Sequence, residues 1–249
     1  MVRLHPLLAL ALGLATAGVA SAGTPSSPGC KGTLYLSFDT GNMRDAELIA
    51  DTLARHGVKA TFFLAQEKTT RGDSALDASW APYWRARVAE GHAFGSHTWR
   101  HGSFRADSGA LVRYRLPDGS SETLDAAGVC AELQRPDTRF QELTGRRLDP
   151  LWRAPGGRTT PNTLAAAQAC GYRHVGWAAA GFLGDELPSE TYPNSLLLQR
   201  ALERLRDGDI VMAHLGIWSR KDPFAPMFEP LIAGLKAKGF CFATRRGQT

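Results

Sequence analysis

This sequence lacks the patterns that would assign it to several common classes of protein. Its four cysteines include no C-x-x-C pair, which weakens the case for a zinc–thiolate site. The nucleophile pattern G-x-S-x-G does not occur, which disfavours a serine esterase. The net charge is only +5, and no run of lysine and arginine with interleaved aromatics is present. We therefore expect no nucleic-acid partner.

Long hydrophobic runs are also missing after the first 22 residues. In that segment Arg3 precedes an apolar stretch, Pro6–Ala20, and the small residues Ala20-Ser21-Ala22. The apolar part is shorter than the roughly 20 residues of a membrane span. Residues 1–22 are therefore interpreted as a cleaved export signal, with an uncleaved anchor as the alternative. Residues 23–29 would form a flexible leader. Residues 30–249 would form one domain, a periplasmic or extracellular monomer without stable membrane insertion.

In an exported chain, the four cysteines indicate two disulfides. Three pairings are possible. Cys30 precedes the first expected strand and Cys241 lies inside the last one. If the sheet closes on itself these strands are neighbours, which favours Cys30–Cys241 together with Cys130–Cys170. The alternative is that some of the four stay reduced and buried.

A repeated unit of amphipathic helix, terminal glycine and short apolar strand predicts the fold class. The first strand is expected at Thr33–Phe38. The four helices are expected at Arg44–His56, Pro161–Cys170, Asn194–Arg206 and Phe224–Lys238. The strands that follow them are expected from Ala60, at Tyr172–Trp177, at Ile210–Ala213 and from Phe240. Glycine readily adopts the backbone that ends a helix, and strands apolar throughout are buried on both faces. The pattern predicts an α/β barrel or open parallel sheet with its site at the carboxyl ends of the strands.

One segment interrupts this alternation of helices and strands. Ala110–Leu124 alternates apolar and polar residues around Pro-Asp-Gly, which is typical of a β-hairpin. The hairpin is either a flap that contacts substrate or a structural insertion without a role in the site.

Polar residues that can perform hydrolysis follow the expected strands. Asp39 lies where the first strand meets a glycine turn, in the segment L-S-F-D-T-G-N-M. His97 and His101 are four residues apart, a spacing that on a helical turn places two imidazoles on one face, suited to a shared cation. Thr98 follows the first histidine where the protease pattern H-E-x-x-H requires glutamate, so a metalloprotease is disfavoured.

Four further segments follow the S-F-D-T-G segment in a characteristic order. They are E-G-H-A-F-G-S-H-T-W-R-H (Glu90–His101), L-W-R-A-P-G-G (Leu151–Gly157), V-G-W (Val175–Trp177) and I-V-M-A-H (Ile210–His214). In this order and spacing, the chain from Gly32 to Phe242 resembles the polysaccharide deacetylase family, the NodB-homology carbohydrate esterases. The resemblance implies a distorted (β/α) barrel. It also implies a metal-dependent hydrolysis that removes acetyl groups from amino sugars, or sometimes from xylan esters.

The resemblance also implies a role for each matching residue. His97 and His101 would bind a divalent metal, zinc first, with cobalt, nickel or manganese as alternatives. Asp39 would be the general base, Arg153 would hold and tune that base, and His214 would be the general acid. A carboxylate can accept a proton from the attacking water, and imidazole can donate one near neutral pH.

Thr40 departs from the family pattern, because the family has a metal-binding acid at this position. A hydroxyl is a poorer ligand than a carboxylate, so the sequence predicts weaker metal affinity than in a relative with both acids. Three outcomes stay open: water fills the place, Asp39 itself coordinates, or the metal is held weakly.

Three more residues are candidates for the substrate pocket. Gly156 stands where the family often has an aromatic whose backbone N–H binds the oxyanion, and glycine keeps that N–H. Trp177 is either a wall of the acetyl pocket or core packing. The family's two acids after this tryptophan are absent here. Asp185 is therefore the candidate that orients Arg153 or His214, with an ordinary surface-loop acid as the alternative.

The leading hypothesis is an exported, metal-dependent deacetylase of N-acetylated polysaccharide. Peptidoglycan is the favoured substrate, followed by chitin-type oligosaccharides and exopolysaccharide. One alternative is a hydrolase of the same fold that cleaves an O-acetyl ester or a non-sugar amide. Another is a catalytically silent carbohydrate-binding protein, motivated by Thr40 and by the missing acids after Trp177.

Overall fold

The computed structural model describes residue 1 and residues 29–246. The predicted export signal and leader lie outside this part, apart from Met1 and Gly29, so both stay predictions. Within the described part of the chain, no helix has the length and apolar character needed to cross a membrane.

A curled sheet of parallel strands forms the centre of the molecule. Its strands lie in the spatial order β10 (Phe240–Phe242), β1 (Gly32–Asp39), β2 (Thr61–Leu64), β3 (Ala93–Ser96), β7 (Leu151–Trp152) and β8 (Arg173–His174), and β9 (Ile210–His214) also pairs with β1. β10 pairs with the first half of β1 and β9 with the second half. This curled sheet with helices outside it is a distorted (β/α) barrel, as the sequence predicts.

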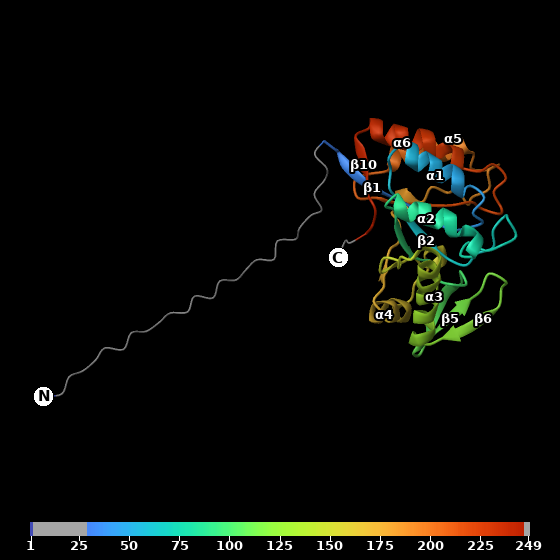
Figure 1. Ribbon diagram of the computed structural model, residues 1–249, viewed down its shortest axis with the longest axis vertical. Helices are drawn as coiled ribbons and strands as arrows, with labels where there is room; N and C mark the ends of the chain where they lie inside the picture. The colour runs from blue at the N-terminus through green and yellow to red at the C-terminus, as the bar shows by residue number, and fades with distance from the viewer. Residues whose placement is uncertain (2–28, 247–249) are drawn as a thin grey trace.

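Helices cover the outside of the sheet. They are α1 (Ala46–Arg55), α2 (Ala81–Ala89), α3 (Ala126–Thr144), α4 (Pro161–Ala169), α5 (Asn194–Arg204) and α6 (Phe228–Ala237). Figure 1 shows α1, α5 and α6 lying together at the end of the molecule near β1 and β10, with α3 and α4 at the opposite end. Thr160 caps the start of α4: its side chain accepts a hydrogen bond from the Thr163 backbone N–H.

Aromatic rings pack between the sheet and the helices. Phe38, Phe62 and Phe94 stand opposite one another on β1, β2 and β3, and adjacent rings stack with centroids 5.7 and 5.8 Å apart. Trp84 of α2 and Phe228 of α6 contact these rings edge-on. Because side chains alternate along a strand, the neighbours of these phenylalanines face the inside of the barrel. Asp39, directly after Phe38, is one of those neighbours.

Two predicted elements are shorter than expected. The strand expected over Tyr172–Trp177 is limited to β8, two residues long. The helix expected from Phe224 begins as α6 at Phe228, after a 3₁₀ turn at Ala225–Met227. That turn contains Pro226, whose ring has no N–H to donate and fits only the opening of a helix.

The predicted hairpin is present and belongs to a separate antiparallel sheet. β5 (Leu111–Arg115) and β6 (Ser121–Leu124) form the hairpin, and β4 (Ser103–Ser108) pairs with the other edge of β5. The sequence analysis did not predict β4. One face of this sheet packs on α3 and α4 through Phe104, Val112 and Tyr114.

Both predicted disulfides are present. Cys30 and Cys241 are bonded with their Cα atoms 5.8 Å apart, and Cys130 and Cys170 with theirs 6.1 Å apart. The parallel pairing of β1 with β10 places Thr33 opposite Cys241. This pairing brings Cys30, just before β1, close to Cys241. The described part of the chain contains no free cysteine.

Candidate active site

Asp39 lies at the carboxyl end of β1, between two neighbouring strands. In the sheet register it stands opposite His214 of β9 on one side and Phe63 of β2 on the other. Gly41 then turns the chain with φ +55°, and a Cβ on it would lie 2.2 Å from the Gly216 carbonyl oxygen. Only glycine fits this turn, which fixes where the buried Asp39 carboxylate points.

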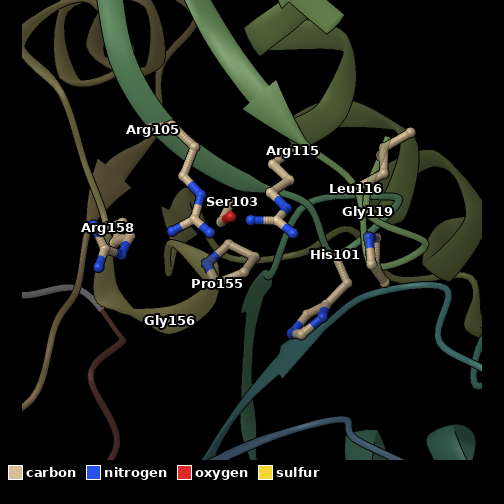
Figure 2. Close-up of a pocket in the computed structure, with 10 residues that line it drawn as sticks. His101, Ser103, Arg105, Arg115, Leu116, Gly119, Pro155, Gly156 and Arg158 are labelled. Atoms are coloured by element: carbon tan, nitrogen blue, oxygen red, sulfur yellow. The ribbon is translucent and has the colours of Figure 1, made fainter. Parts of the chain in front are cut away.

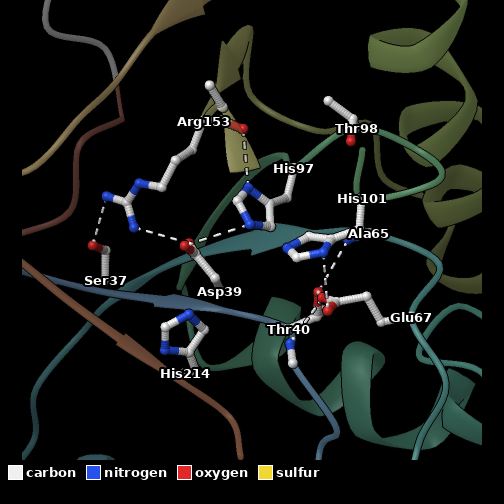
Figure 3. Close-up of polar contacts among 12 residues, drawn as sticks. Ser37, Asp39, Thr40, Ala65, Glu67, His97, Thr98, His101, Arg153 and His214 are labelled. Atoms are coloured by element: carbon white, nitrogen blue, oxygen red, sulfur yellow. Dashed lines mark hydrogen bonds and ion pairs between the residues drawn. The ribbon is translucent and has the colours of Figure 1, made fainter. Parts of the chain in front are cut away.

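Arg153, which directly follows β7, holds the Asp39 carboxylate. Its Nη1 donates to Asp39 Oδ1 at 2.9 Å and its Nη2 donates to Ser37 Oγ at 2.8 Å (Figure 3). Its Nε donates to the Val175 carbonyl oxygen at 3.1 Å. Burial opposes ionisation of Asp39, but the Arg153 guanidinium first, and His214 with it, outweigh burial and lower the pKa of Asp39 below its usual value. The carboxyl group is therefore ionised and can accept a proton.

His97 follows β3 and faces the same carboxylate. Its Nδ1 lies 3.0 Å from the Arg153 carbonyl oxygen, which can only accept, so Nδ1 carries the proton in this contact. Its Nε2 lies 3.5 Å from Asp39 Oδ2. Burial first, and His101 to a smaller extent, lower the pKa of His97 to about 4 against the opposing effects of Asp39 and Glu67. The ring is thus neutral, with the Nε2 lone pair free for a ligand.

His101 meets His97, although not on a helix. Both histidines lie in the loop between β3 and β4, and the expected helical turn is wrong. The loop folds back because Thr98 and His101 adopt positive φ angles of 64° and 53°. The two ring centroids lie 4.8 Å apart. The predicted pair therefore forms through a strained loop rather than through helical periodicity.

Glu67 is a residue that the sequence analysis missed. Its Oε2 accepts hydrogen bonds from Thr40 Oγ1 at 2.5 Å and from the Gly41 N–H at 2.9 Å. Its Oε1 lies 3.5 Å from His101 Nδ1 (Figure 3). Glu67 thus places a carboxylate beside Thr40, where the family pattern has an acid. The available signal was its position three residues after β2, since neighbouring parallel strands end at one rim.

His214 and Asp185 form the other side of the site. Asp185 Oδ2 accepts a hydrogen bond from the His214 backbone N–H at 2.8 Å, and its Oδ1 lies 3.2 Å from His214 Nδ1. Glu186 Oε2 lies 3.5 Å from His214 Nε2. Burial opposes protonation, but Asp185 first, then Asp39 and Glu186, raise the pKa of His214 to about 9. His214 is therefore protonated at neutral pH.

The other two predicted pocket residues lie beside Arg153 and His101. The Trp177 ring centroid is 5.6 Å from the Arg153 guanidinium carbon, and the ring covers Gly157. Gly156, exposed and with φ +63°, lines a cavity together with His101. Trp177 thus supports Arg153, and Gly156 faces the open side of the site.

The side chains around Asp39 suit a divalent cation. Zinc and related metals bind imidazole and carboxylate groups. His97 and His101 supply two imidazoles here, and Glu67 supplies a carboxylate. In the described residues no three such side chains already converge on one point. Coordination would therefore require Glu67 to turn from Thr40 toward the imidazoles, a movement open to a side chain with three rotatable bonds. On donor chemistry the residues fit the metal.

Comparisons with known proteins identify the family of this chain. The sequence model of the polysaccharide deacetylase family matches residues 26–175. A chitooligosaccharide deacetylase from Azorhizobium caulinodans is 24% identical, across 84% of this chain and 90% of the relative. The peptidoglycan-N-acetylmuramic acid deacetylase PdaA of Bacillus subtilis is also 24% identical, across 84% and 68%.

Solved structures show the same fold. A family 4 acetyl xylan esterase from Clostridium thermocellum, determined with a cobalt ion, superposes with a TM-score of 0.66 at 21% identity, over 85% of this chain and 87% of that one. The family match covers more than half of the sequence and includes Asp39, both loop histidines and Arg153. This chain therefore belongs to the polysaccharide deacetylase family.

Proposed function

We propose that this protein is an exported, divalent-metal-dependent enzyme that removes N-acetyl groups from an amino-sugar polysaccharide. The observation that carries the proposal is the juxtaposition of an ionised Asp39 and a protonated His214 across one pair of strands. A pair of titratable groups whose environments push their pKa values apart is the arrangement that general base and general acid need. The two disulfides support a location outside the reducing cytoplasm.

Asp39 acts as the general base in this proposal. Its carboxylate accepts a proton from the water that attacks the acetyl carbonyl, and Arg153 keeps it ionised and correctly oriented. Arg153 is itself fixed, because Ser37 and the Val175 carbonyl hold the rest of the guanidinium group. Proton transfer therefore needs no rearrangement of the base.

His214 acts as the general acid. Asp185 holds Nδ1, so Nε2 is the nitrogen whose proton passes to the amine that leaves the acetyl group. An amine is a poor leaving group without that proton, and a positioned acid contributes about 10²- to 10⁴-fold to such a step. Asp185, a predicted site residue, thus orients the acid rather than the arginine.

The metal would be held by His97, His101 and a carboxylate, with zinc the first choice and cobalt, nickel or manganese as alternatives. When bound, such a cation lowers the pKa of water from 15.7 to about 7 and polarises a carbonyl. Glu67 is proposed as the carboxylate ligand in place of the family acid, and Thr40 as the residue that positions Glu67 through its hydroxyl. The Gly156 N–H is proposed to bind the oxyanion, and Trp177 to wall the acetyl pocket.

Peptidoglycan is the leading substrate in this proposal, followed by chitin-type oligosaccharides and exopolysaccharide. Two relatives, matched over 90% and 68% of their own lengths, act by their names on chitooligosaccharide and on N-acetylmuramic acid of peptidoglycan. Both are polymers of N-acetylated amino sugars. The proposed chemistry at Asp39 and His214 is the same for either.

The test is mass spectrometry of muropeptides and chito-oligosaccharides incubated with the protein, with and without zinc or cobalt. We expect the loss of one acetyl group, its disappearance on chelation and its return with metal. The Asp39→Asn variant should keep the fold by circular dichroism and release no acetate. Full turnover by that variant would overturn the assignment of the base, and absence of acetate release under every condition would overturn the proposed activity.

A further inference from the structure

A groove lined by arginines opens directly beside His101. A cavity of about 540 Å³ contacts His101 at one end and Arg105, Arg115 and Arg158 at the other. A second cavity of about 520 Å³ shares these three arginines and adds Arg113. Figure 2 shows the guanidinium groups of Arg105 and Arg115 side by side, with Ser103 between them and Pro155 below. We call these two adjoining cavities the arginine groove.

The strands of the small sheet place these side chains. Along β5, Val112 and Tyr114 are buried against α3 and α4, so Arg113 and Arg115 project from the opposite face. Arg105 lies at the register shift between Phe104 and Ala106 in β4. A bulge of this kind re-aims one side chain out of the regular alternation. Arg158 enters from the other side, just after the Gly156 turn.

The four arginines of the groove have no partners among the described residues. None of their guanidinium groups forms a hydrogen bond or an ion pair there, and no aspartate or glutamate lines either cavity. The acids of the same sheet are engaged elsewhere: Glu122 with Arg100, Asp107 with the Asn162 N–H, and Asp118 with Ser120. Among the described residues, no acid therefore forms an ion pair with the arginines of the groove.

Several arginines outside the groove form ion pairs with acids. Arg55 contacts Glu229, Arg71 contacts Glu47 and Arg139 contacts Glu142. Close spacing of four like charges without acids costs free energy through repulsion. Such an arrangement is typical of a surface that meets an anionic ligand, and the planar guanidinium group suits carboxylate and phosphate.

A third cavity adjoins the arginine groove at His101 and could hold the rest of a bound polymer. It has a volume of about 700 Å³, shares His101, Leu116 and Pro117 with the arginine groove, and is also lined by Trp218. Trp218 is 66% exposed, which is unusual for this residue type and leaves its ring free to stack on a sugar. A chain lying across His101 would thus reach an aromatic face at one end and the four arginines at the other.

Resting on the proposed deacetylase function, we infer that the arginine groove selects a glycan that carries an anionic group close to the acetylated sugar. The recognised chemistry is a carboxylate or a phosphate on the polymer. The groove is a specificity site and not part of the reacting groups, because neither Asp39 nor His214 lines either of its cavities. Neutral polymers should then be poorer substrates than anionic ones.

The experiment compares acetate release from three N-acetylated glycans of similar length. One is a neutral chito-oligosaccharide, one contains muramic acid with free carboxylates, and one carries phosphate groups. For the enzyme we expect a higher kcat/KM on an anionic glycan, falling as salt is raised, while the neutral glycan is unaffected. The carboxylate and phosphate arms identify which anion is recognised.

The decisive variant is the double substitution Arg105→Gln with Arg115→Gln. We expect its kcat/KM on the preferred anionic glycan to fall about tenfold through KM, with the neutral glycan changed less than about twofold. Arg204→Gln, which removes an exposed charge from α5, is the control for overall charge and should change neither. Equal rates on all three glycans, or equal losses on neutral and anionic glycans, would overturn the inference.

Calorimetric binding of the same glycans separates this inference from the proposed activity. If no glycan releases acetate but the anionic ones bind and lose affinity in the double variant, the groove assignment stands and the catalytic proposal fails. If acetate is released without any anion preference in rate or binding, the catalytic proposal stands and the groove assignment fails.

Discussion

At the scale of single residues, Thr40 is neutral, and the nearby carboxylate comes from another part of the chain. Thr40 cannot supply a negative charge, but its hydroxyl holds Glu67, which comes 27 residues later. Glu67 as the metal ligand, which we propose, was not among the three outcomes left open by the sequence. An acid in a polar loop shows no local pattern, and only the pairing of β1 with β2 brings it to Thr40.

Substitution of Glu67 tests whether its carboxylate binds the metal. We expect Glu67→Gln to weaken zinc binding to the metal-free protein by at least about tenfold, since loss of even an indirect partner of a metal site costs 10- to 100-fold. Titration calorimetry measures the change. Glu47→Gln, which removes a carboxylate paired with Arg71 on the surface, is the matched control. Unchanged zinc affinity in Glu67→Gln would return the choice to water or Asp39 as the ligand.

Asp185 gives a second prediction at this scale, about pH. Asp185 is the main group that raises the pKa of His214 to about 9. His214 is therefore protonated below that pH and loses its proton above it. In Asp185→Asn we expect the alkaline limb of the kcat/KM profile to move down by about one unit or more. Glu186→Gln removes the same charge at the other ring nitrogen, where its effect on His214 is smaller, and should move the limb less. A limb that stays in place in Asp185→Asn would exclude His214 as the acid.

At the scale of elements, apolar runs and glycines located the helices α1, α4, α5 and α6 and the strands β1, β2, β9 and β10, but not α2, α3 or β4. Those features follow from burial and backbone freedom, which act within a few residues of sequence. The loop that carries His97 and His101 was predicted wrongly as a helical turn, because a spacing of four residues is typical of a helix. Its actual shape depends on positive φ angles at Thr98 and His101, which these residue types seldom adopt. The pair was predicted correctly and its backbone was not.

The cap of α4 gives a prediction about stability. The Thr160 side chain accepts a hydrogen bond from the Thr163 N–H, and the Thr163 side chain accepts one from the Thr160 N–H. We expect Thr160→Ala to lower the free energy of unfolding by about 1 kcal/mol, measured by urea denaturation. Thr159→Ala, one residue earlier and outside this reciprocal pair, should change it by much less. Equal effects of the two substitutions would show that the cap contributes little.

At the scale of the whole molecule, buried histidines set the pH range of stability. Burial lowers the pKa of His92, His97 and His174 to about 4 from 6.5. The unfolded chain therefore binds more protons, and their contribution to stability is lost as pH falls from 6.5 to 4. His214 acts oppositely: with its pKa raised to about 9, its contribution is present below pH 6.5 and is lost as pH rises to 9.

We expect the metal-free protein to be most stable near pH 6.5, with a lower Tm at both pH 4 and pH 9. Scanning calorimetry at these three values measures the effect. His214→Gln should remove the loss on the alkaline side while keeping the loss on the acid side. A Tm that still rises from pH 6.5 to pH 9 in the unsubstituted protein would contradict the sign of the His214 contribution.

The covalent link between Cys30 and Cys241 has a consequence for how this molecule responds to proteolysis. The two cysteines are 211 residues apart in sequence, so almost every described peptide bond lies inside the ring that they close. A single cut within that ring, for example at the exposed tip formed by Pro117 and Gly119, opens the backbone but releases no fragment. The nicked molecule would migrate as one species on a denaturing gel until a thiol reagent separates its two pieces.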